Sequence, residues 1–372
     1  MRAVDGDVYD SDKPGRLLAA RQRFQIMENN HQPPQPQRVQ PTIPLWRGFN
    51  LTELTSGERG QAFRESDFAL LAEWGFNFAR LPLNYWAWSS KEDWLKIDEH
   101  ALAPVDQALA WGRQYGIHLN VCLHRIPGYC VNNRELEPYR LFDSTPDDMT
   151  RALEATTYHW RYFARRYKDV PTAQLSFDLL NEPPFMAEHS HYEKVIRTLV
   201  GAIREHNAER LIFVDGADIG QTPVLSVADL GVVQSTRGYL PKMVSHYTAN
   251  WVPLNEFESF EKPAWPMTDK HGRRWDRAAL REELILKWQP LVKQGVPIHV
   301  GEWGCYIKTP HDVALAWMAD LLAIWKEAGW GWSMWNFRGE FGLLDSNRAD
   351  VAYEDFRGHK LDRKMLELLL AR

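Results

Sequence analysis

The sequence predicts an α/β fold in which eight short strands alternate with helices, and it favours a closed (β/α)8 barrel, a TIM barrel, over an open sheet. The apolar runs are too hydrophobic for strands with one solvated face, which indicates a parallel sheet covered by helices. Eight such runs over roughly 330 residues fit the size of a (β/α)8 barrel. The structural alternative is an open doubly wound sheet. Its nucleotide-binding versions lose support because no G-x-G-x-x-G or Walker-type loop follows a run.

We expect the eight strands at the short apolar runs between residues 45 and 337. They are 45–51 (LWRGFNL), 77–83 (NFARLPL), 118–124 (HLNVCLH), 174–180 (QLSFDLL), 210–216 (RLIFVDG), 242–247 (KMVSHY), 297–303 (PIHVGEW) and 331–337 (GWSMWNF).

Segments with helical spacing separate these runs. The segments 64–75 and 97–116 each end at a glycine, and 311–329 is amphipathic and also ends at a glycine. The segment 145–168 begins with Thr145 as an N-cap, followed by proline and two acidic residues. Only a weak helical pattern, near 224–230, lies between the fifth and sixth expected strands.

The N-terminal part of the chain differs from the rest. Residues 1–44 include the Pro- and Gln-rich stretch NNHQPPQPQRVQPTIP, which predicts an extended or disordered arm with at most a short helix at 16–27. We therefore expect two parts, an arm at 1–44 and a single catalytic domain at 45–372.

The composition is that of a soluble globular protein, with 44% hydrophobic and 25% charged residues among 372. A net charge of −5 gives no reason to expect nucleic acid or a membrane surface as partner. No apolar run is long enough for a transmembrane helix, and the N-terminus lacks a signal-peptide core, so the chain is expected in the cytoplasm unless a signal has been removed. The three cysteines predict free thiols rather than disulfides.

Polar residues stand at the ends of six of the eight expected strands. Because the βα loops at the carboxyl ends of barrel strands form the shared cavity, these residues are the candidates for an active site. They are Arg80, His124, Asn181 with Glu182, His246 with Tyr247, Glu302, and Trp335 with Asn336.

Two of these residues, Glu182 and Glu302, are carboxylates. Such a pair is what glycosidic hydrolysis requires, because one group protonates the departing sugar oxygen and the other attacks or supports the anomeric carbon. Their pKa values must be separated, which burial of one carboxyl and an arginine beside the other can achieve. A structural ion-pair role is the alternative for each.

Several of the seventeen tryptophans fall at helical positions and are expected to pack in the core, whereas others could contact a sugar. Trp86 and Trp251 fall beside expected loops after strands, where a flat ring can stack on a pyranose face. Packing within loops is the alternative for both. No metal or cofactor is expected, because His189 and His191 are two positions apart and do not share a helix face. A serine hydrolase is not expected either, because the sequence has no G-x-S-x-G motif.

The motifs "LLNEPP" at 179–184 and "VGEWG" at 300–304 resemble the signature strands of glycoside hydrolase family 5, a family of retaining (β/α)8 enzymes. "RGFNL" at 47–51 and "ARLPLNYW" at 79–86 extend the resemblance. With His124, Tyr247 and Trp335 it covers residues 45 to about 370.

The resemblance implies a role for each matching residue. Glu182 would be the acid/base, Glu302 the nucleophile, and Asn181 the hydrogen-bond partner of the sugar 2-hydroxyl. Retention requires the two carboxyl groups to lie about 5–5.5 Å apart.

The remaining matches would hold the nucleophile or bind the sugar. Arg80 and Tyr247 would keep Glu302 ionised and oriented, while His124 and Trp335 would contact the sugar in the −1 subsite.

One departure from the family falls after the sixth expected strand. The family shows His-x-Tyr there, whereas this chain has Ser245-His246-Tyr247. In a strand, alternation would turn His246 away from the face used by Tyr247.

The resemblance implies an oligo- or polysaccharide substrate, and we expect a β-glucan hydrolase, with endo-β-1,4-glucanase ahead of exo-β-1,3-glucanase or β-glucosidase. Mannan-active enzymes also occur in the family, so the motif does not decide the sugar. Two further alternatives are a carbohydrate-binding protein without catalysis and a transglycosylase.

Overall fold

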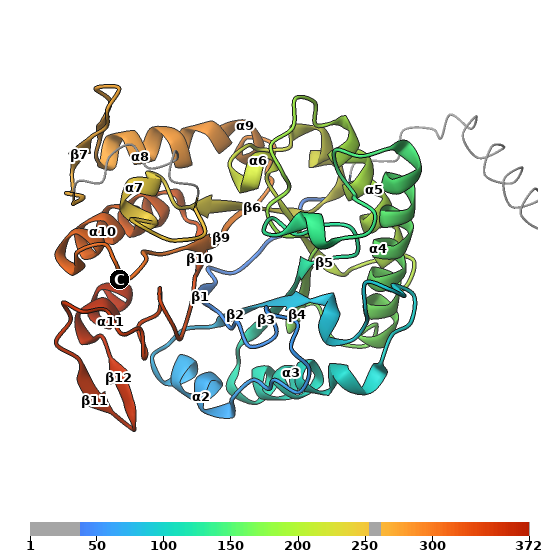
Figure 1. The fold of residues 1–372 in the computed structure, drawn as a ribbon, viewed down its shortest axis with the longest axis horizontal. Coiled ribbons are helices and arrows are strands. Elements are labelled where there is room, and N and C mark those ends of the chain that lie inside the picture. Colours follow the sequence, from blue (N-terminus) through green and yellow to red (C-terminus); the bar gives the residue numbers. More distant parts are fainter. Residues whose placement is uncertain (1–37, 253–261, 372) are drawn as a thin grey trace, which may run out of the picture. The chain divides into compact units, whose positions relative to one another are not determined.

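The computed structural model describes residues 38–252 and 262–371, shown as the coloured ribbon in Figure 1. Most of the predicted arm, including the short helix expected at 16–27, lies outside the described residues. The last residues before the barrel, 38–44, contain no helix or strand. Gln40 donates from Nε2 to the carbonyl of Ala228 at 2.6 Å, which holds this segment to the loop before the sixth barrel strand.

Eight parallel strands of the described chain form a closed barrel in the order β1-β10-β9-β6-β5-β4-β3-β2, which confirms the predicted fold. The strands are β1 (Arg47–Asn50), β2 (Phe78–Asn84), β3 (His118–Arg125), β4 (Leu175–Asp178), β5 (Leu211–Asp215), β6 (Val233–Gly238), β9 (Ile298–Trp303) and β10 (Gly331–Met334). Each strand is hydrogen-bonded to the strands on either side of it in this order, and β1 closes the barrel against β10. All carboxyl ends therefore meet at one rim.

The prediction for the sixth strand is wrong. The sixth barrel strand is β6 at Val233–Gly238, and the expected run at 242–247 instead contains the one-turn helix α7 (Lys242–Ser245). The sequence of β6, VQSTRG, is mostly polar, yet all six residues are buried. Partners inside the protein satisfy these polar groups; Gln234, for example, exchanges hydrogen bonds with the backbone of Val224. A search for apolar runs cannot find such a strand.

Helices cover the outside of the barrel (Figure 1). The longer ones are α2 (Glu65–Glu73), α3 (Ala103–Tyr115), α4 (Pro146–Arg166), α5 (Ser190–Arg204), α8 (Arg277–Leu284), α10 (His311–Ala328) and α11 (Arg363–Leu370). The predicted cap of α4 is present, because the Thr145 side chain accepts from the amide of Asp148 at 3.2 Å. Gly116 and Gly329 end α3 and α10 in the left-handed conformation.

Shorter elements occupy the connections. They are the single turns α6 (Ala217–Gly220) and α9 (Gln289–Val292), the 3-10 turns η1 (Tyr85–Ala87), η2 (Glu99–Leu102), η3 (Arg134–Leu136), η4 (Leu225–Leu230) and η6 (Leu286–Trp288), and two hairpins, β7 (Met267–Thr268) with β8 (Arg274–Trp275) and β11 (Glu354–Phe356) with β12 (His359–Leu361). The weak helical pattern near 224–230 corresponds to η4.

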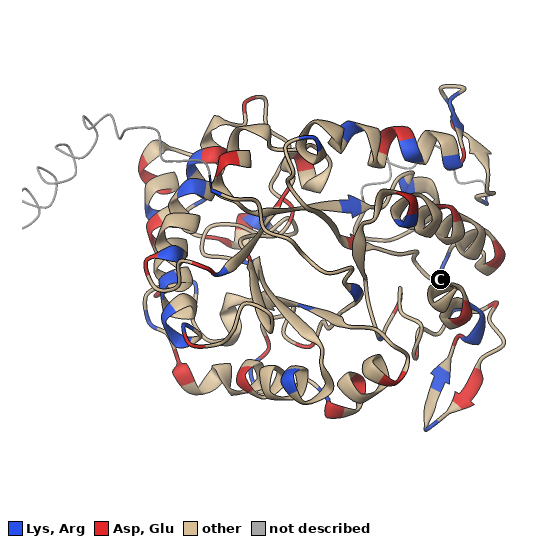
Figure 2. Cartoon of the chain, turned by 180° about the vertical axis from the view of Figure 1, so that it is seen from behind, with Lys and Arg blue, Asp and Glu red and all other residues tan. Residues whose placement is uncertain are grey.

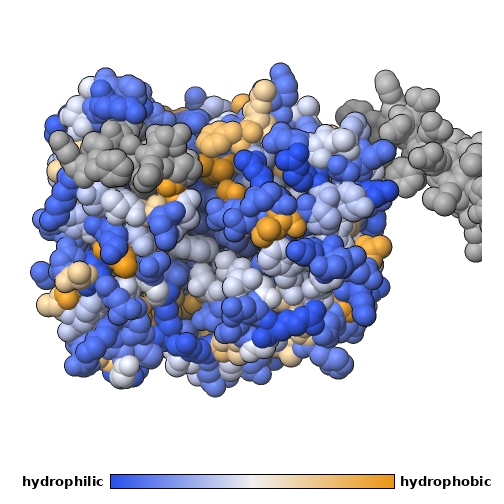
Figure 3. Space-filling model, viewed as in Figure 1, coloured by the Kyte–Doolittle hydropathy of each residue, from blue (hydrophilic) through white to orange (hydrophobic). Residues whose placement is uncertain are grey.

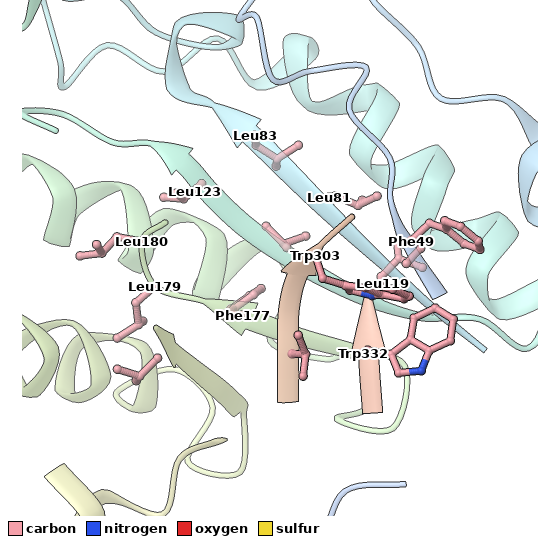
Figure 4. Close-up of a cluster of buried hydrophobic side chains, with 14 of the residues drawn as sticks. Phe49, Leu81, Leu83, Leu119, Leu123, Phe177, Leu179, Leu180, Trp303 and Trp332 are labelled. Atoms are coloured by element: carbon pink, nitrogen blue, oxygen red, sulfur yellow. The ribbon is translucent and has the colours of Figure 1, made fainter. Parts of the chain in front are cut away.

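The core is built from side chains of the strands and the inner helix faces. Figure 4 shows Phe49, Leu81, Leu119, Phe177 and Trp303 as part of one buried cluster that spans β1, β2, β3, β4 and β9. Burial of such side chains contributes roughly 1.5–3 kcal/mol each to folding.

The outer surface is that of a water-exposed domain. Basic and acidic residues are interspersed over the outer helices in Figure 2, and hydrophobic residues form only scattered groups on the face in Figure 3. Cys122, Cys130 and Cys305 are free and buried. Among the described residues, no helix is both long and apolar enough to cross a membrane.

Two glycines at helix positions give opposite expectations for stability. Gly329 ends α10 with φ +71° and has open space around it, so Gly329→Ala should lower the free energy of unfolding by about 1 kcal/mol through backbone strain alone. Gly201 lies within α5, also with open space, so Gly201→Ala should raise it by about 0.5–1 kcal/mol. Urea denaturation measures both, and a loss of stability in both variants would contradict this account.

Candidate active site

A cavity of about 820 Å³ opens where the carboxyl ends of the strands meet. The ends of β3, β6 and β9 and the loops after β3, β4, β5, β6 and β10 supply its walls. Residues that line it include His124, Tyr129, Arg134, Glu182, Phe185, Ile219, Gln221, Arg237, Tyr239, His246, Trp251, Glu302, Trp335, Asn336 and Phe341.

Glu302 lies near the end of β9 with its side chain only 5% exposed. Its Oε1 accepts a hydrogen bond from Arg80 Nη1 at 2.6 Å, and its Oε2 accepts one from the Tyr239 hydroxyl at 3.2 Å. Burial alone would raise the pKa of Glu302, but the charges of Arg237 and Arg80 outweigh it and hold the pKa below its ordinary value. Glu302 is therefore ionised over the neutral pH range.

Glu182 lies beyond the end of β4 at Asp178 and is followed by Pro183 and Pro184, which have no backbone amide hydrogen to donate. Its backbone has φ +50°, a conformation unusual for a residue with a side chain. Two hydrogen bonds hold this conformation: the Glu182 amide donates to Asp215 Oδ2 at 2.8 Å, and the Glu182 carbonyl accepts from the Tyr129 hydroxyl at 2.6 Å. Strained backbone kept in place by surrounding contacts is a feature of functional sites.

The carboxyl group of Glu182 has a different electrostatic setting from that of Glu302. Its Oε1 accepts from Arg237 Nε at 3.0 Å, and the side chain is 16% exposed. Burial, reinforced by the negative charge of Glu302, raises the pKa of Glu182 to about 7, although Arg237 opposes the shift. The cavity thus contains one carboxyl that keeps its proton to about neutral pH and one that has lost it.

Arg80 lies beneath the two carboxylates and is buried in the barrel interior. Besides Glu302 it donates to Asp178 Oδ2 and Asn181 Oδ1, both at 2.8 Å, and to Asn50 Oδ1 at 2.9 Å. Asn181 is held from two sides, because its Oδ1 also accepts from Arg237 Nη2 at 2.8 Å. Its Nδ2 has no hydrogen-bond acceptor among the described residues, so this amide is free to donate to a ligand.

The structure does not give Tyr247 the position expected for it. Tyr247 follows α7 rather than a strand, and among the described residues it does not belong to the lining of the cavity. Tyr239, directly after β6, contacts Glu302 instead. The triplet Arg237-Gly238-Tyr239 therefore has the spacing of the family's His-x-Tyr, with an arginine in place of the histidine. Placing the sixth strand at 242–247 hid this match.

His124 and Trp335 lie against each other on one wall of the cavity. Their rings stack at a centroid distance of 5.5 Å and an angle of 22°. Burial lowers the pKa of His124 to about 4, so the imidazole is neutral at pH 7. His124 Nδ1 has no hydrogen-bond partner among the described residues. Asn336 follows Trp335 and also lines the cavity.

Of the other residues considered in the sequence, two lie in the cavity and one does not. His246 lines it and packs edge-on against Tyr239 at 4.8 Å, contrary to the expectation that it turns away. Trp251 also lines it and is 44% exposed. Trp86 is outside the lining, and the guanidinium of Arg125 covers its ring at 4.3 Å, so Trp86 serves packing.

Sequence reasoning missed three charged or polar residues of the site: Asp215, Arg237 and Tyr239. Asp215 is the last residue of β5 and Arg237 the second-last residue of β6. Both therefore lie at strand ends, the criterion by which the other candidates were chosen. Within residues 38–252 and 262–371, no three His, Cys, Asp or Glu side chains form a possible metal site.

A parallel (β/α)8 barrel with a neutral and an ionised carboxyl group in one cavity is an arrangement suited to a glycoside hydrolase. Comparison with known proteins specifies the family. Residues 38–340, more than half of the chain, match the family model described as cellulase (glycosyl hydrolase family 5). The chain belongs to glycoside hydrolase family 5.

Individual relatives support the same family. Endoglucanase C of Acetivibrio thermocellus is 24% identical over 312 residues, covering 78% of this chain and 88% of that protein. Glucan 1,3-beta-glucosidase 1 of Schizosaccharomyces pombe is 34% identical over 126 residues, which cover 32% of this chain and 29% of that protein. A crystal structure of a glycoside hydrolase superposes with a TM-score of 0.81 at 36% identity, covering 88% of this chain and 99% of the other.

The two tyrosines near β6 allow a matched test of the corrected assignment. Tyr239→Phe removes a hydrogen bond to ionised Glu302, worth about 1.5–3 kcal/mol, and should lower kcat/KM about ten- to a hundredfold. Tyr247→Phe should change kcat/KM by less than about threefold. Steady-state kinetics on an aryl β-glycoside measures both, and the reverse order of effects would restore Tyr247 to the site.

The raised pKa of Glu182 also predicts how stability depends on pH. Between the ordinary value of 4.5 and about 7, the folded protein keeps a proton that the unfolded chain has lost, so the free energy of unfolding falls as pH rises through this window. Glu182→Gln removes this loss of stability. The free energy of unfolding of the variant should therefore exceed that of the wild type by about 1–3 kcal/mol near pH 8, but not near pH 4.

The matched control for this prediction is Glu302→Gln. It removes an ionised partner of buried Arg80 and should therefore destabilise the protein near pH 8. Urea denaturation at both pH values measures the two variants, and a pH-independent effect of Glu182→Gln would contradict the raised pKa.

Proposed function

We propose that this enzyme hydrolyses β-glucans with retention of configuration, as an endo-β-1,4-glucanase in which Glu182 is the acid/base and Glu302 the nucleophile. The observation that carries the proposal is that two glutamates share one cavity and have different charged partners. Arg80 and Tyr239 contact the carboxyl that must be ionised to attack. The carboxyl with a raised pKa is the one that must carry a proton.

In the first step, an oxygen of Glu302 attacks the anomeric carbon while the bond to the leaving sugar breaks. Glu182 transfers its proton to the departing oxygen, and Glu302 becomes a glycosyl ester. Asn181 contributes here because its free Nδ2 donor can bind the sugar 2-hydroxyl, an interaction that strengthens in the transition state.

In the second step, Glu182 is an anion and accepts a proton from water as the water oxygen attacks the anomeric carbon. The ester bond breaks, and Glu302 returns to its ionised state. Neutral His124 and the ring of Trp335, stacked on one wall, offer a hydrogen-bonding edge and an apolar face to the sugar bound between the carboxylates.

The relatives support a β-glucan as substrate. The similarity to Endoglucanase C extends over most of both chains, whereas that to the yeast 1,3-glucosidase covers about a third of each. Exposed Trp251 and Phe185 in the cavity wall offer additional stacking faces for a chain of several sugars. Exo-β-1,3-glucanase action is the second candidate, favoured by the higher identity of the shorter match.

A covalent adduct tests the mechanism. The wild type should gain the mass of one glycosyl group when incubated with 2,4-dinitrophenyl 2-deoxy-2-fluoro-β-cellobioside, and peptide mapping should place the label on Glu302. The reason is that the fluorine slows both steps, whereas the activated leaving group speeds only the first, so the glycosyl-enzyme accumulates. Glu302→Gln is the control and should not be labelled.

Product analysis then tests the substrate. Cello-oligosaccharides should be cut at internal bonds, laminari- and manno-oligosaccharides more slowly or not at all. Release of single glucose units from laminari-oligosaccharides would instead favour the exo-1,3 candidate. No adduct together with no turnover on these three series would contradict the proposed function.

A further inference from the structure

Arg237 contacts both carboxyl groups of the cavity. Its Nε lies 3.0 Å from Glu182 Oε1, and its Nη2 lies 3.7 Å from Glu302 Oε1. The side chain is 2% exposed. Asp215 fixes the guanidinium by a two-pronged ion pair, with Nη1 to Oδ1 at 3.1 Å and Nη2 to Oδ2 closer still. The planar fork of an arginine suits such a multiple contact.

Arg80 has a different set of partners, although it is buried at the same depth. It donates to Glu302 at 2.6 Å and to Asp178 at 2.8 Å. Of Glu182 and Glu302, Arg80 therefore pairs with Glu302, whereas Arg237 is in contact with both.

This difference matters because negative charge moves during the proposed reaction, on which the inference rests. Before the first step Glu302 is the anion and Glu182 carries a proton. After it, Glu302 is a neutral ester and Glu182, having given its proton to the leaving oxygen, is the anion. Water attack reverses both changes, because the water proton goes to Glu182 as the ester bond breaks. A cation in contact with only one of the two glutamates would stabilise the moving charge in only one half of the cycle.

We propose that Arg237 is a positioning residue that pairs with the negative charge as it moves from Glu302 to Glu182, and that it acts chiefly on hydrolysis of the glycosyl-enzyme. Asp215 keeps the guanidinium in reach of both carboxyls and also accepts the backbone amide of Glu182 at 2.8 Å. One aspartate therefore orients the acid/base and the cation that stabilises its ionised form.

The other groups around Glu182 set the direction of the pH effects. Glu302 and Asp215 are acidic and favour protonated Glu182, whereas Arg237 favours the ionised form and has a larger influence than Asp215. Tyr129 contacts the Glu182 carbonyl, and Tyr239 lies beside Glu302; both are neutral, because burial raises their pKa values well above the ordinary range.

Two variants separate these influences. Asp215→Asn removes the negative charge that partly neutralises Arg237, so the guanidinium stabilises ionised Glu182 more strongly. The double variant R237Q/D215N removes the guanidinium without leaving Asp215 buried and unpaired. The basic limb of kcat/KM on cellotetraose reports ionisation of Glu182 in the free enzyme. We expect it to move to lower pH in Asp215→Asn and to higher pH in R237Q/D215N.

The rate of the second step is measured with 2,4-dinitrophenyl β-cellobioside, whose leaving group needs no proton. For R237Q/D215N we expect kcat to fall at least about tenfold and KM to fall with it, while kcat/KM stays within about threefold. Asp215→Asn should retain a higher kcat than the double variant. Azide, which attacks without a base, should restore the kcat of R237Q/D215N.

Labelling of wild-type Glu302 by the fluorinated cellobioside, done first, separates failure of the proposed function from failure of this inference. With labelling established, an equal loss in kcat and kcat/KM, an unchanged kcat, or shifts of the basic limb in the same direction in both variants would overturn the role of Arg237. If R237Q/D215N does not fold, Arg237→Lys replaces it: an ammonium group has three donors and lacks the planar fork with which Arg237 contacts Asp215 and both glutamates at once. Arg237→Lys should then lower kcat more than kcat/KM, and an unchanged ratio between them would overturn the inference.

Discussion

The charge balance between two buried guanidinium groups and the carboxyls around them is the constraint on which the site depends. Arg80 and Arg237 lie inside the barrel, where an unpaired ion would cost several kcal/mol. The acidic groups that surround them are Asp178, Asp215, Glu182 and Glu302. Two cations cannot compensate four anions at such close range. The pKa values of Asp178 and Glu182 are accordingly raised, to about 6 and about 7, chiefly through burial. The difference in pKa between the two glutamates thus follows from how the cations are distributed: Glu302 is in direct contact with Arg80 and within reach of Arg237, while Glu182 contacts Arg237 alone.

The backbone places these charges where the chemistry requires them. Closure of the barrel brings the ends of β4, β5, β6 and β9 to one rim, so that residues far apart in the sequence come within hydrogen-bond distance. Glu182 then needs a local distortion to direct its carboxyl into the cavity, and its positive φ provides it. Asp215 at the end of β5 and Tyr129 in the loop after β3 hold that conformation. The geometry of the site therefore depends on the folding of the whole barrel.

Much of this arrangement could be predicted from the sequence, for identifiable reasons. Seven of the eight strands were located because they are buried on both faces and therefore read as apolar runs, and Glu182 and Glu302 stood out as carboxylates at the ends of such runs. The sixth strand is not recognisable as an apolar run, because most of its buried residues are polar and have polar partners inside the protein. Tyr239 and Arg237 were missed with it, and Tyr247 was assigned a role that its position after α7 does not support.

The sequence by itself determined the fold class and the family and singled out two carboxylates as candidates, because each is encoded locally: in hydrophobic runs, in turn-forming prolines and glycines, and in short motifs. Only the tertiary structure decided which groups surround those carboxylates. Arg237 contacts Glu182 across a separation of 55 residues and Asp215 across 22. No local pattern reveals that one guanidinium lies between two carboxyls. Their pKa values depend on distance and burial, which exist only once the barrel has closed.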